Sequence, residues 1–138
     1  MHYSVLLVDD EKQSMRWYHK ALTTSGFKVS QLVNPDQVRD FIDNPENRPP
    51  DVIILDIMLP PGAWYRNTPQ AQRGLRTGVL LYEECLSKYT RTPIIVLTNV
   101  NKPDLAKALP ADAHVFSKLD VPPFRLVDIL RGLVPSYN

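Results

Sequence analysis

Acidic residues follow two strongly apolar runs of the sequence. Asp9 and Asp10 come directly after the run 4–8, and Asp56 comes after the run 52–55. Such runs of leucine and β-branched residues are typical of strands buried on both faces of a parallel sheet. The residue after each strand would emerge at the carboxyl edge, where open α/β folds bind their ligands. Three carboxylates at one edge repel one another unless a cation binds, so the pattern predicts a divalent metal site.

The composition indicates one ordinary globular domain. The 138 residues are 43% hydrophobic and 22% charged, with a formal net charge of +1, which gives no indication of nucleic-acid or membrane binding. We expect a single domain over residues 1–138 and no segment long enough to cross a bilayer. Cys85 is the only cysteine, so no internal disulfide is expected. With no signal peptide expected before the first strand, a cytoplasmic location is the default prediction.

Strands and helices are expected to alternate along the whole chain. Apolar periodicity, capping residues and the positions of proline and glycine define the elements. The expected strands are 4–8, 28–33, 52–56, 94–98 and 114–117, and the expected helices are 13–25, 35–43, 77–89, 102–109 and 123–133. Parallel strands joined by right-handed helical crossovers give a doubly wound α/β sandwich of flavodoxin-like (βα)5 topology. We expect its five-stranded parallel sheet to have the strand order 2-1-3-4-5.

The first expected helix shows how apolar side chains should divide between the core and the surface. Met15, Tyr18 and Leu22 recur at spacings of three and four residues, which is typical of an amphipathic helix. Trp17 on this helix and Tyr82 and Cys85 on the third are expected to be packing residues rather than part of a cofactor site. If exposed on a helix face, they could instead serve an interface.

Five polar residues fall at the carboxyl ends of the expected strands. In chain order these residues are Asp9, Asp10, Asp56, Thr98 and Lys118. Together they resemble the receiver domain of two-component response regulators, and the resemblance covers essentially the whole chain. The matching stretches are 8–11, 56–60, 97–98 and 117–118. A lone pair of aspartates is a weak signal, whereas five matching positions on their proper elements form a strong one.

The resemblance implies a phosphorylation site that binds Mg²⁺. Asp56 would be the phosphoacceptor and a metal ligand, so the chain would be a signalling module rather than a turnover enzyme. Asp10 would bind the ion directly, Asp9 would hold it through water, and the backbone carbonyl of Met58 would add another oxygen. Such oxygen donors suit Mg²⁺, which keeps several waters and is often bound by one or two carboxylates and a phosphate.

The resemblance also implies how the signal would be received and passed on. Lys118 would neutralise charge on the phosphoryl group, while Thr98 would hydrogen-bond one of its oxygens and carry the change to the surface. That surface, formed by 102–109, 114–117 and 123–133, is also a candidate homodimer interface. A sensor histidine kinase or histidine phosphotransfer protein would supply the phosphoryl group, and a downstream protein would read the change. Neither nucleic acid nor membrane is expected as a direct partner.

Each site residue also has an interpretation that involves no phosphorylation. Asp56 could be an ordinary polar residue at the end of a strand, and Thr98 could be a turn former. Asp9 or Asp10 alone could cap the first helix, which is a common role for aspartate. Lys118 alone would most often be a solvated surface residue. The occurrence of all five polar groups at one sheet edge favours the phosphorylation site, because independent accidents would have to coincide there.

The chain departs from the family pattern after the phosphoacceptor. The family usually has a glycine eight residues after this aspartate, but the best match here is Gly78, which lies 22 residues after Asp56. About fourteen residues are therefore inserted within 61–76, and a loop of this length is usually functional or disordered. Trp64, Tyr65 and the arginines of the insertion could form a lid over the site or a core-capping surface loop, and the sequence leaves both open.

Three further departures concern the phosphoryl pocket and the transmission of the signal. Leu119 replaces the proline that usually follows the lysine in a cis peptide, so a trans link is expected. Val115 stands where the family has its switch aromatic, and Asn99 stands where a small residue is usual. Val115, Leu119 and the insertion support an alternative function, in which a receiver-like interaction domain acts without phosphorylation.

Overall fold

The protein folds around one parallel sheet. The computed structural model describes residues 2–57, 59, 62–68, 77–98, 109 and 113–134. Its strands are β1 (Ser4–Val8), β2 (Lys28–Leu32), β3 (Val52–Leu55), β4 (Ile94–Thr98) and β5 (His114–Ser117). All four neighbouring pairs are parallel and the order is β2-β1-β3-β4-β5, which confirms the expected topology.

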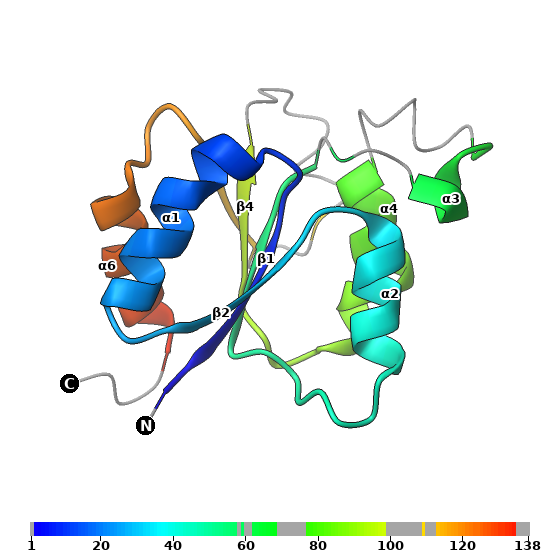
Figure 1. Ribbon diagram of the computed structural model, residues 1–138, viewed down its shortest axis with the longest axis horizontal. Coiled ribbons are helices and arrows are strands. Elements are labelled where there is room, and N and C mark those ends of the chain that lie inside the picture. The colour runs from blue at the N-terminus through cyan, green and yellow to red at the C-terminus, as the bar shows by residue number, and fades with distance from the viewer. Residues whose placement is uncertain are drawn as a thin grey trace.

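Helices cover both faces of this sheet (Figure 1). They are α1 (Lys12–Thr24), α2 (Pro35–Asp43), α3 (Gly62–Tyr65), α4 (Thr77–Glu84), the 3-10 turn η2 (Leu86–Lys88) and α6 (Pro123–Leu133). Helices α1 and α6 lie on one face, and α2, α3 and α4 lie on the other. The doubly wound sandwich is therefore confirmed. No helix within the described ranges is long and apolar enough to span a membrane.

The central strands supply alternate side chains to two hydrophobic clusters. On β1, Leu6 and Val8 pack with the α2 and α4 side, whereas Val5 and Leu7 pack with the α1 and α6 side. All four side chains are buried, as the uninterrupted apolar run predicted. Side chains of β1 and β3 are thus buried on both faces of the sheet, and these two strands position Asp9 and Asp56 at its carboxyl edge.

Two local expectations were wrong. The expected helix 77–89 ends at Glu84, because Cys85 departs from helical geometry with φ −126° and ψ −59° and a 3-10 turn follows. Trp17 is 61% exposed, because the buried stripe of α1 runs through Met15, Tyr18 and Leu22. The expected helix 102–109 lies outside the described residues except for the buried Leu109.

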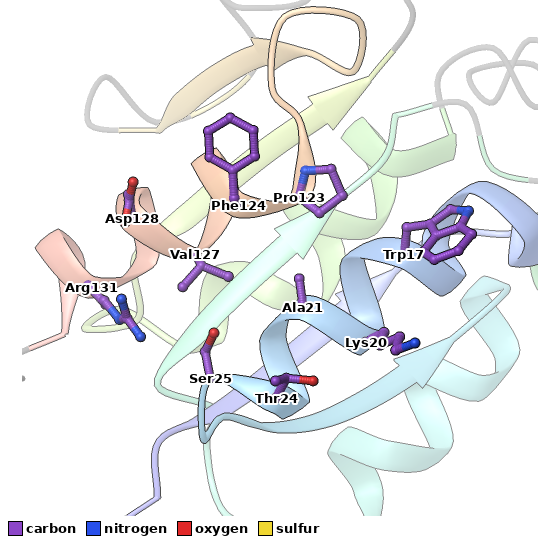
Figure 2. A pocket seen from close by; sticks show the side chains of 10 residues that line it. All are labelled: Trp17, Lys20, Ala21, Thr24, Ser25, Pro123, Phe124, Val127, Asp128 and Arg131. Carbon is purple, nitrogen blue, oxygen red and sulfur yellow. The ribbon is translucent and has the colours of Figure 1, made fainter.

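Trp17 contributes to a surface groove between α1 and α6. Figure 2 shows its side chain and those of Phe124 and Val127 projecting from these two helices. The groove has a volume of about 640 Å³ and is lined also by Lys20, Asp128 and Arg131. None of its lining residues is one of the polar groups at the strand ends, so the groove is separate from the acidic residues described below.

Candidate functional site

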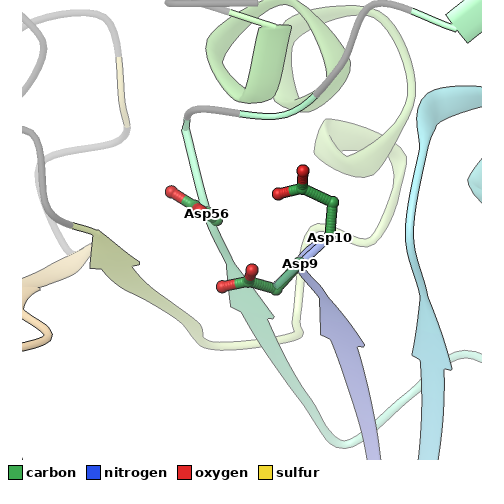
Figure 3. A group of neighbouring side chains, drawn as sticks. All are labelled: Asp9, Asp10 and Asp56. Atoms are coloured by element: carbon green, nitrogen blue, oxygen red, sulfur yellow. The ribbon is translucent and has the colours of Figure 1, made fainter. Parts of the chain in front are cut away.

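The three aspartates predicted from the sequence lie together at the carboxyl edge of the sheet. β1 and β3 pair in parallel with Val8 opposite Leu55, and the backbone N–H of Asp56 donates to the carbonyl of Val8 at 2.9 Å. One carboxylate oxygen from each of Asp9, Asp10 and Asp56 lies within 4.8 Å of the other two (Figure 3). Asp9 and Asp56 are buried, whereas Asp10 is exposed.

Lys118 reaches into this acidic cluster from the end of β5. Its Nζ lies 2.8 Å from Asp9 Oδ2, 3.2 Å from Asp56 Oδ2 and 3.5 Å from Glu11 Oε2. The lysine side chain is only 7% exposed, so its charge is held among the carboxylates and away from water. The interpretation of Lys118 as a solvated surface residue is therefore wrong.

One ammonium group does not offset the charge of the whole cluster. Burial raises the pKa of Asp9 to about 6, and repulsion from Asp56 adds to this effect although Lys118 and the Glu11 backbone N–H oppose it. Burial disfavours the charged form of Lys118, but hydrogen bonding to Asp9 and attraction by Asp56 and Asp9 prevail and raise its pKa. The site therefore keeps a fully protonated lysine and an excess of negative charge that favours cation binding.

Replacing Asp9 by asparagine is expected to stabilise the protein at pH 7.5 by about 1 to 3 kcal/mol without divalent cations. The pKa of Asp9 lies near 6 in the folded protein and near 3.8 in the unfolded chain. The folded protein therefore binds a proton at Asp9 more tightly than the unfolded chain does, and protonation of Asp9 favours folding. That stabilisation is complete below about pH 4 and is lost as the pH rises through 6.

Urea unfolding of wild type and Asp9→Asn across this pH range measures the effect. The stability difference should grow from near zero at pH 4 to its full value at pH 7.5. Asp43→Asn, at an exposed position, is the control and should stay within about 0.5 kcal/mol of wild type. A variant that is less stable than wild type at pH 7.5 would contradict this account of the cluster.

Gly78 packs directly against the backbone of the candidate phosphoacceptor. Its N–H donates to the carbonyl of Ile57 at 2.8 Å, at the start of α4. A Cβ at this position would lie 2.3 Å from the carbonyl oxygen of Asp56 and 2.5 Å from Cα of Ile57. No side chain fits there, which explains why glycine is needed at this position despite the insertion before it.

The described part of the insertion, 62–68, is anchored to α2. Both carboxylate oxygens of Asp36 accept backbone N–H groups, from Ala63 at 2.8 Å and from Trp64 at 3.0 Å. The guanidinium carbon of Arg39 lies 4.3 Å from the centre of the Trp64 ring, a cation–π contact. Tyr65 is buried beside it, and the two rings stack with centroids 5.1 Å apart.

These contacts bear on the two interpretations of the insertion. The Tyr65 hydroxyl donates to Glu84 on α4, so α3 is fastened to α2 and α4 at the side of the sheet (Figure 1). The contacts of residues 62–68 thus agree with the interpretation of the insertion as a core-capping surface loop. The arginines Arg73 and Arg76, on which the lid hypothesis also depended, lie outside the described residues.

Replacing Asp36 by alanine is expected to lower the free energy of unfolding by about 1 to 2 kcal/mol, because two backbone N–H groups of α3 lose a charged acceptor. Asp40→Ala, at an exposed position on the same helix, is the matched control for helix propensity and charge. Urea unfolding of both variants measures the difference. Equal losses would show that the anchor contributes nothing.

The structure places some of the other predicted site residues, and the rest lie outside the described ranges. Thr98 ends β4 opposite Ser117, and Ser117 directly precedes Lys118. Thr98 and Lys118 therefore lie at the same carboxyl edge of the sheet as the acidic cluster. Met58, predicted to offer its carbonyl, and Asn99 lie outside the described residues. The described residues contain no cis peptide, so the Lys118–Leu119 link is trans as expected.

Comparison with known proteins shows the family of this chain. The sequence pattern of the response regulator receiver domain matches residues 5–131. This chain belongs to the receiver domain family. Among curated proteins no sequence matches it. Receiver domains are signalling modules of two-component systems rather than turnover enzymes.

Solved receiver structures share its fold at low sequence identity. A CheY-like receiver domain protein from Methanospirillum hungatei is 19% identical, with a TM-score of 0.73 over 96% of this chain and 93% of that one. The phosphorylated cyanobacterial phytochrome response regulator RcpA is 19% identical, with a TM-score of 0.71 over 100% and 97% of the two chains. The BeF3-activated receiver domain of Klebsiella pneumoniae RstA is 20% identical, with a TM-score of 0.70 over 96% and 98%.

Receiver domains generally bind Mg²⁺ at an acidic pocket, and the residues of this receiver fit that ion. Asp9, Asp10 and Asp56 offer hard carboxylate oxygens close together, which is the donor type that Mg²⁺ prefers. Asp10 is exposed and can bind an ion that keeps part of its water shell. The excess negative charge around Lys118 adds a further reason for a cation to bind here.

Proposed function

We propose that this receiver domain accepts a phosphoryl group on Asp56 in a Mg²⁺-dependent reaction and then presents a changed surface to a protein partner. The donor is a phosphohistidine of a sensor histidine kinase or a histidine phosphotransfer protein. The observation that carries the proposal is the position of Lys118, whose ammonium contacts Asp56 at 3.2 Å and Asp9 at 2.8 Å. A cytoplasmic location remains the accompanying expectation.

The chemistry follows from the positions of these side chains. A carboxylate oxygen of Asp56 attacks phosphorus in line, and a new O–P bond forms as the bond from phosphorus to the donor imidazole breaks. Lys118 is placed to neutralise charge on the transferred phosphoryl oxygens, because its ammonium already touches the nucleophile. Asp9 also contacts that ammonium, at 2.8 Å. Mg²⁺ bound by the aspartate cluster would supply further charge neutralisation.

Two of the similar structures support the proposal at the level of the fold. RcpA was solved in a phosphorylated form and the RstA receiver in a BeF3-activated form. The present chain has the same fold, and its aspartate cluster lies at the carboxyl edge of the sheet. The candidate homodimer surface includes 102–109, of which the structure describes only Leu109.

The alternative is a receiver-like interaction domain that acts without phosphorylation. The residue type at position 115 on β5 favours this alternative. Val115 is exposed, and valine has no aromatic ring that could turn inward together with Thr98. The two functions predict different responses to a phosphoryl mimic, so one experiment separates them.

Beryllofluoride with Mg²⁺ tests the proposal. It binds a carboxylate as a phosphoryl mimic and should shift the amide NMR resonances of residues at the carboxyl edge in the wild type and in Asp43→Asn. Asp56→Asn should show no such shifts. An unshifted wild-type spectrum would favour the interaction domain that needs no phosphorylation.

A further inference from the structure

A buried tyrosine on α1 contacts the turn that carries Lys118. Tyr18 is 7% exposed, and its hydroxyl donates to the carbonyl of Val121 at 2.5 Å. The same hydroxyl lies 3.3 Å from the carbonyl of Lys118. Burial raises the pKa of Tyr18, so the hydroxyl keeps its proton and remains a donor at neutral pH.

The two carbonyls are the two ends of one short turn between β5 and α6. Inside this turn, the N–H of Asp120 donates to the Ser117 carbonyl at 3.0 Å, and the N–H of Leu119 donates to Ser117 Oγ at 3.3 Å. The side chain of Leu119 is 90% exposed, so it anchors nothing. Val121 is buried in the same hydrophobic cluster as Tyr18.

The turn is therefore anchored by the buried Val121 but not by the side chain of Leu119. The family usually has a proline after the lysine, but here Leu119 takes its place with a trans peptide. The Tyr18 hydroxyl joins both ends of the turn and comes from α1, which packs on the rigid sheet. Lys118 must cross from this turn to Asp9 and Asp56, so a shift of its backbone moves its ammonium.

We infer that Tyr18 is a positioning residue for Lys118: its hydroxyl fastens the 118–121 turn and thereby holds the ammonium between Asp9 and Asp56. Tyr18 touches neither carboxylate and acts only through the backbone of the turn. The consequence for phosphoryl transfer rests on the proposed function of Asp56, whereas the consequence for the position of Lys118 does not.

Tyr18→Phe tests the inference because it removes the hydroxyl and keeps the buried ring. Tyr65→Phe is the matched control, since it removes a tyrosine hydroxyl that donates to Glu84 on the other face of the sheet. The first readout is the NMR resonance of the Lys118 ε-methylene group, assigned by its absence in Lys118→Arg. It should move toward the value of an exposed lysine in Tyr18→Phe and stay unchanged in Tyr65→Phe.

The second readout is the rate of Asp56 phosphorylation by acetyl phosphate at saturating Mg²⁺. It should fall about three- to tenfold in Tyr18→Phe, which corresponds to the loss of one hydrogen bond, and less than about twofold in Tyr65→Phe. An unchanged Lys118 resonance would overturn the inference, and so would a shifted resonance with an unchanged rate in a protein that acetyl phosphate does modify. A shifted resonance in a protein that no donor modifies would support the role of Tyr18 and refute the proposed function.

Discussion

Replacing Lys118 by methionine should slow phosphoryl transfer from acetyl phosphate to Asp56 by about 100-fold or more. The ammonium lies 3.2 Å from Asp56, and the lysine side chain is almost fully buried. A dissolved cation should therefore not replace the ammonium in the variant. Methionine keeps the length and apolar stem of the side chain but cannot neutralise charge on the phosphoryl oxygens. The measurement is the initial rate of modification, followed by intact mass at saturating Mg²⁺.

The same substitution should have the opposite effect on cation affinity. Removing a positive charge that lies 2.8 Å from Asp9 takes a cationic group away from the buried carboxylates, so Mg²⁺ should bind more tightly. Without Mg²⁺ the variant should lose about 3 kcal/mol of stability, and added Mg²⁺ should restore most of it. Titration calorimetry and urea unfolding with and without Mg²⁺ measure these two effects.

Lys88→Met is the control for the loss of one lysine charge, because Lys88 is an exposed residue of the 3-10 turn η2. It should change the transfer rate by less than about twofold and leave Mg²⁺ affinity the same. If Lys118→Met slowed transfer no more than this control, the ammonium would have no part in the reaction.

Replacing Gly78 by alanine should destabilise the protein by about 3 kcal/mol or more. The added Cβ would lie 2.3 Å from the Asp56 carbonyl oxygen and 2.5 Å from Cα of Ile57, and both neighbours are backbone atoms that no rotamer change can move. Relief requires α4 or the end of β3 to shift. Asp56 follows β3 directly, so phosphorylation should also be impaired in the fraction that folds.

Gly132→Ala is the matched control for this substitution. Gly132 lies on α6, and among the described residues outside its own helix backbone and chain neighbours no atom lies within 4 Å of the position of a Cβ, so alanine should stabilise the helix by up to about 1 kcal/mol. Urea unfolding of the two variants should therefore give changes of opposite sign. A Gly78→Ala protein as stable as wild type would show that the contact between α4 and Asp56 is looser than the distances indicate.

The fold and the acidic cluster could be predicted from the sequence because their determinants are local. An uninterrupted apolar run followed by aspartate defines both a buried strand and the residue at its carboxyl end, as for Val8 and Asp9. The end of α4 was predicted less well. Apolar residues continue through Leu86, and periodicity does not reveal that Cys85 leaves the helical conformation.

Contacts between distant parts of the chain could not be predicted in the same way. Asp36 binds a backbone N–H 27 residues away, and Tyr18 binds a carbonyl 103 residues away. In the sequence these two residues appear as an acidic first-turn residue and a core aromatic. Only the packing of α3 against α2 and of α1 against the 118–121 turn assigns them a second role.

Intact mass after incubation with acetyl phosphate and Mg²⁺ tests the central claim most directly, with wild type, Asp56→Asn and Asp43→Asn compared side by side. The account predicts the mass of one added phosphoryl group in the wild type and in Asp43→Asn, no addition in Asp56→Asn, and no addition anywhere when Mg²⁺ is chelated. A phosphoryl group on Asp56→Asn, or an unmodified wild type with several donors, would contradict the assignment of Asp56 as the phosphoacceptor.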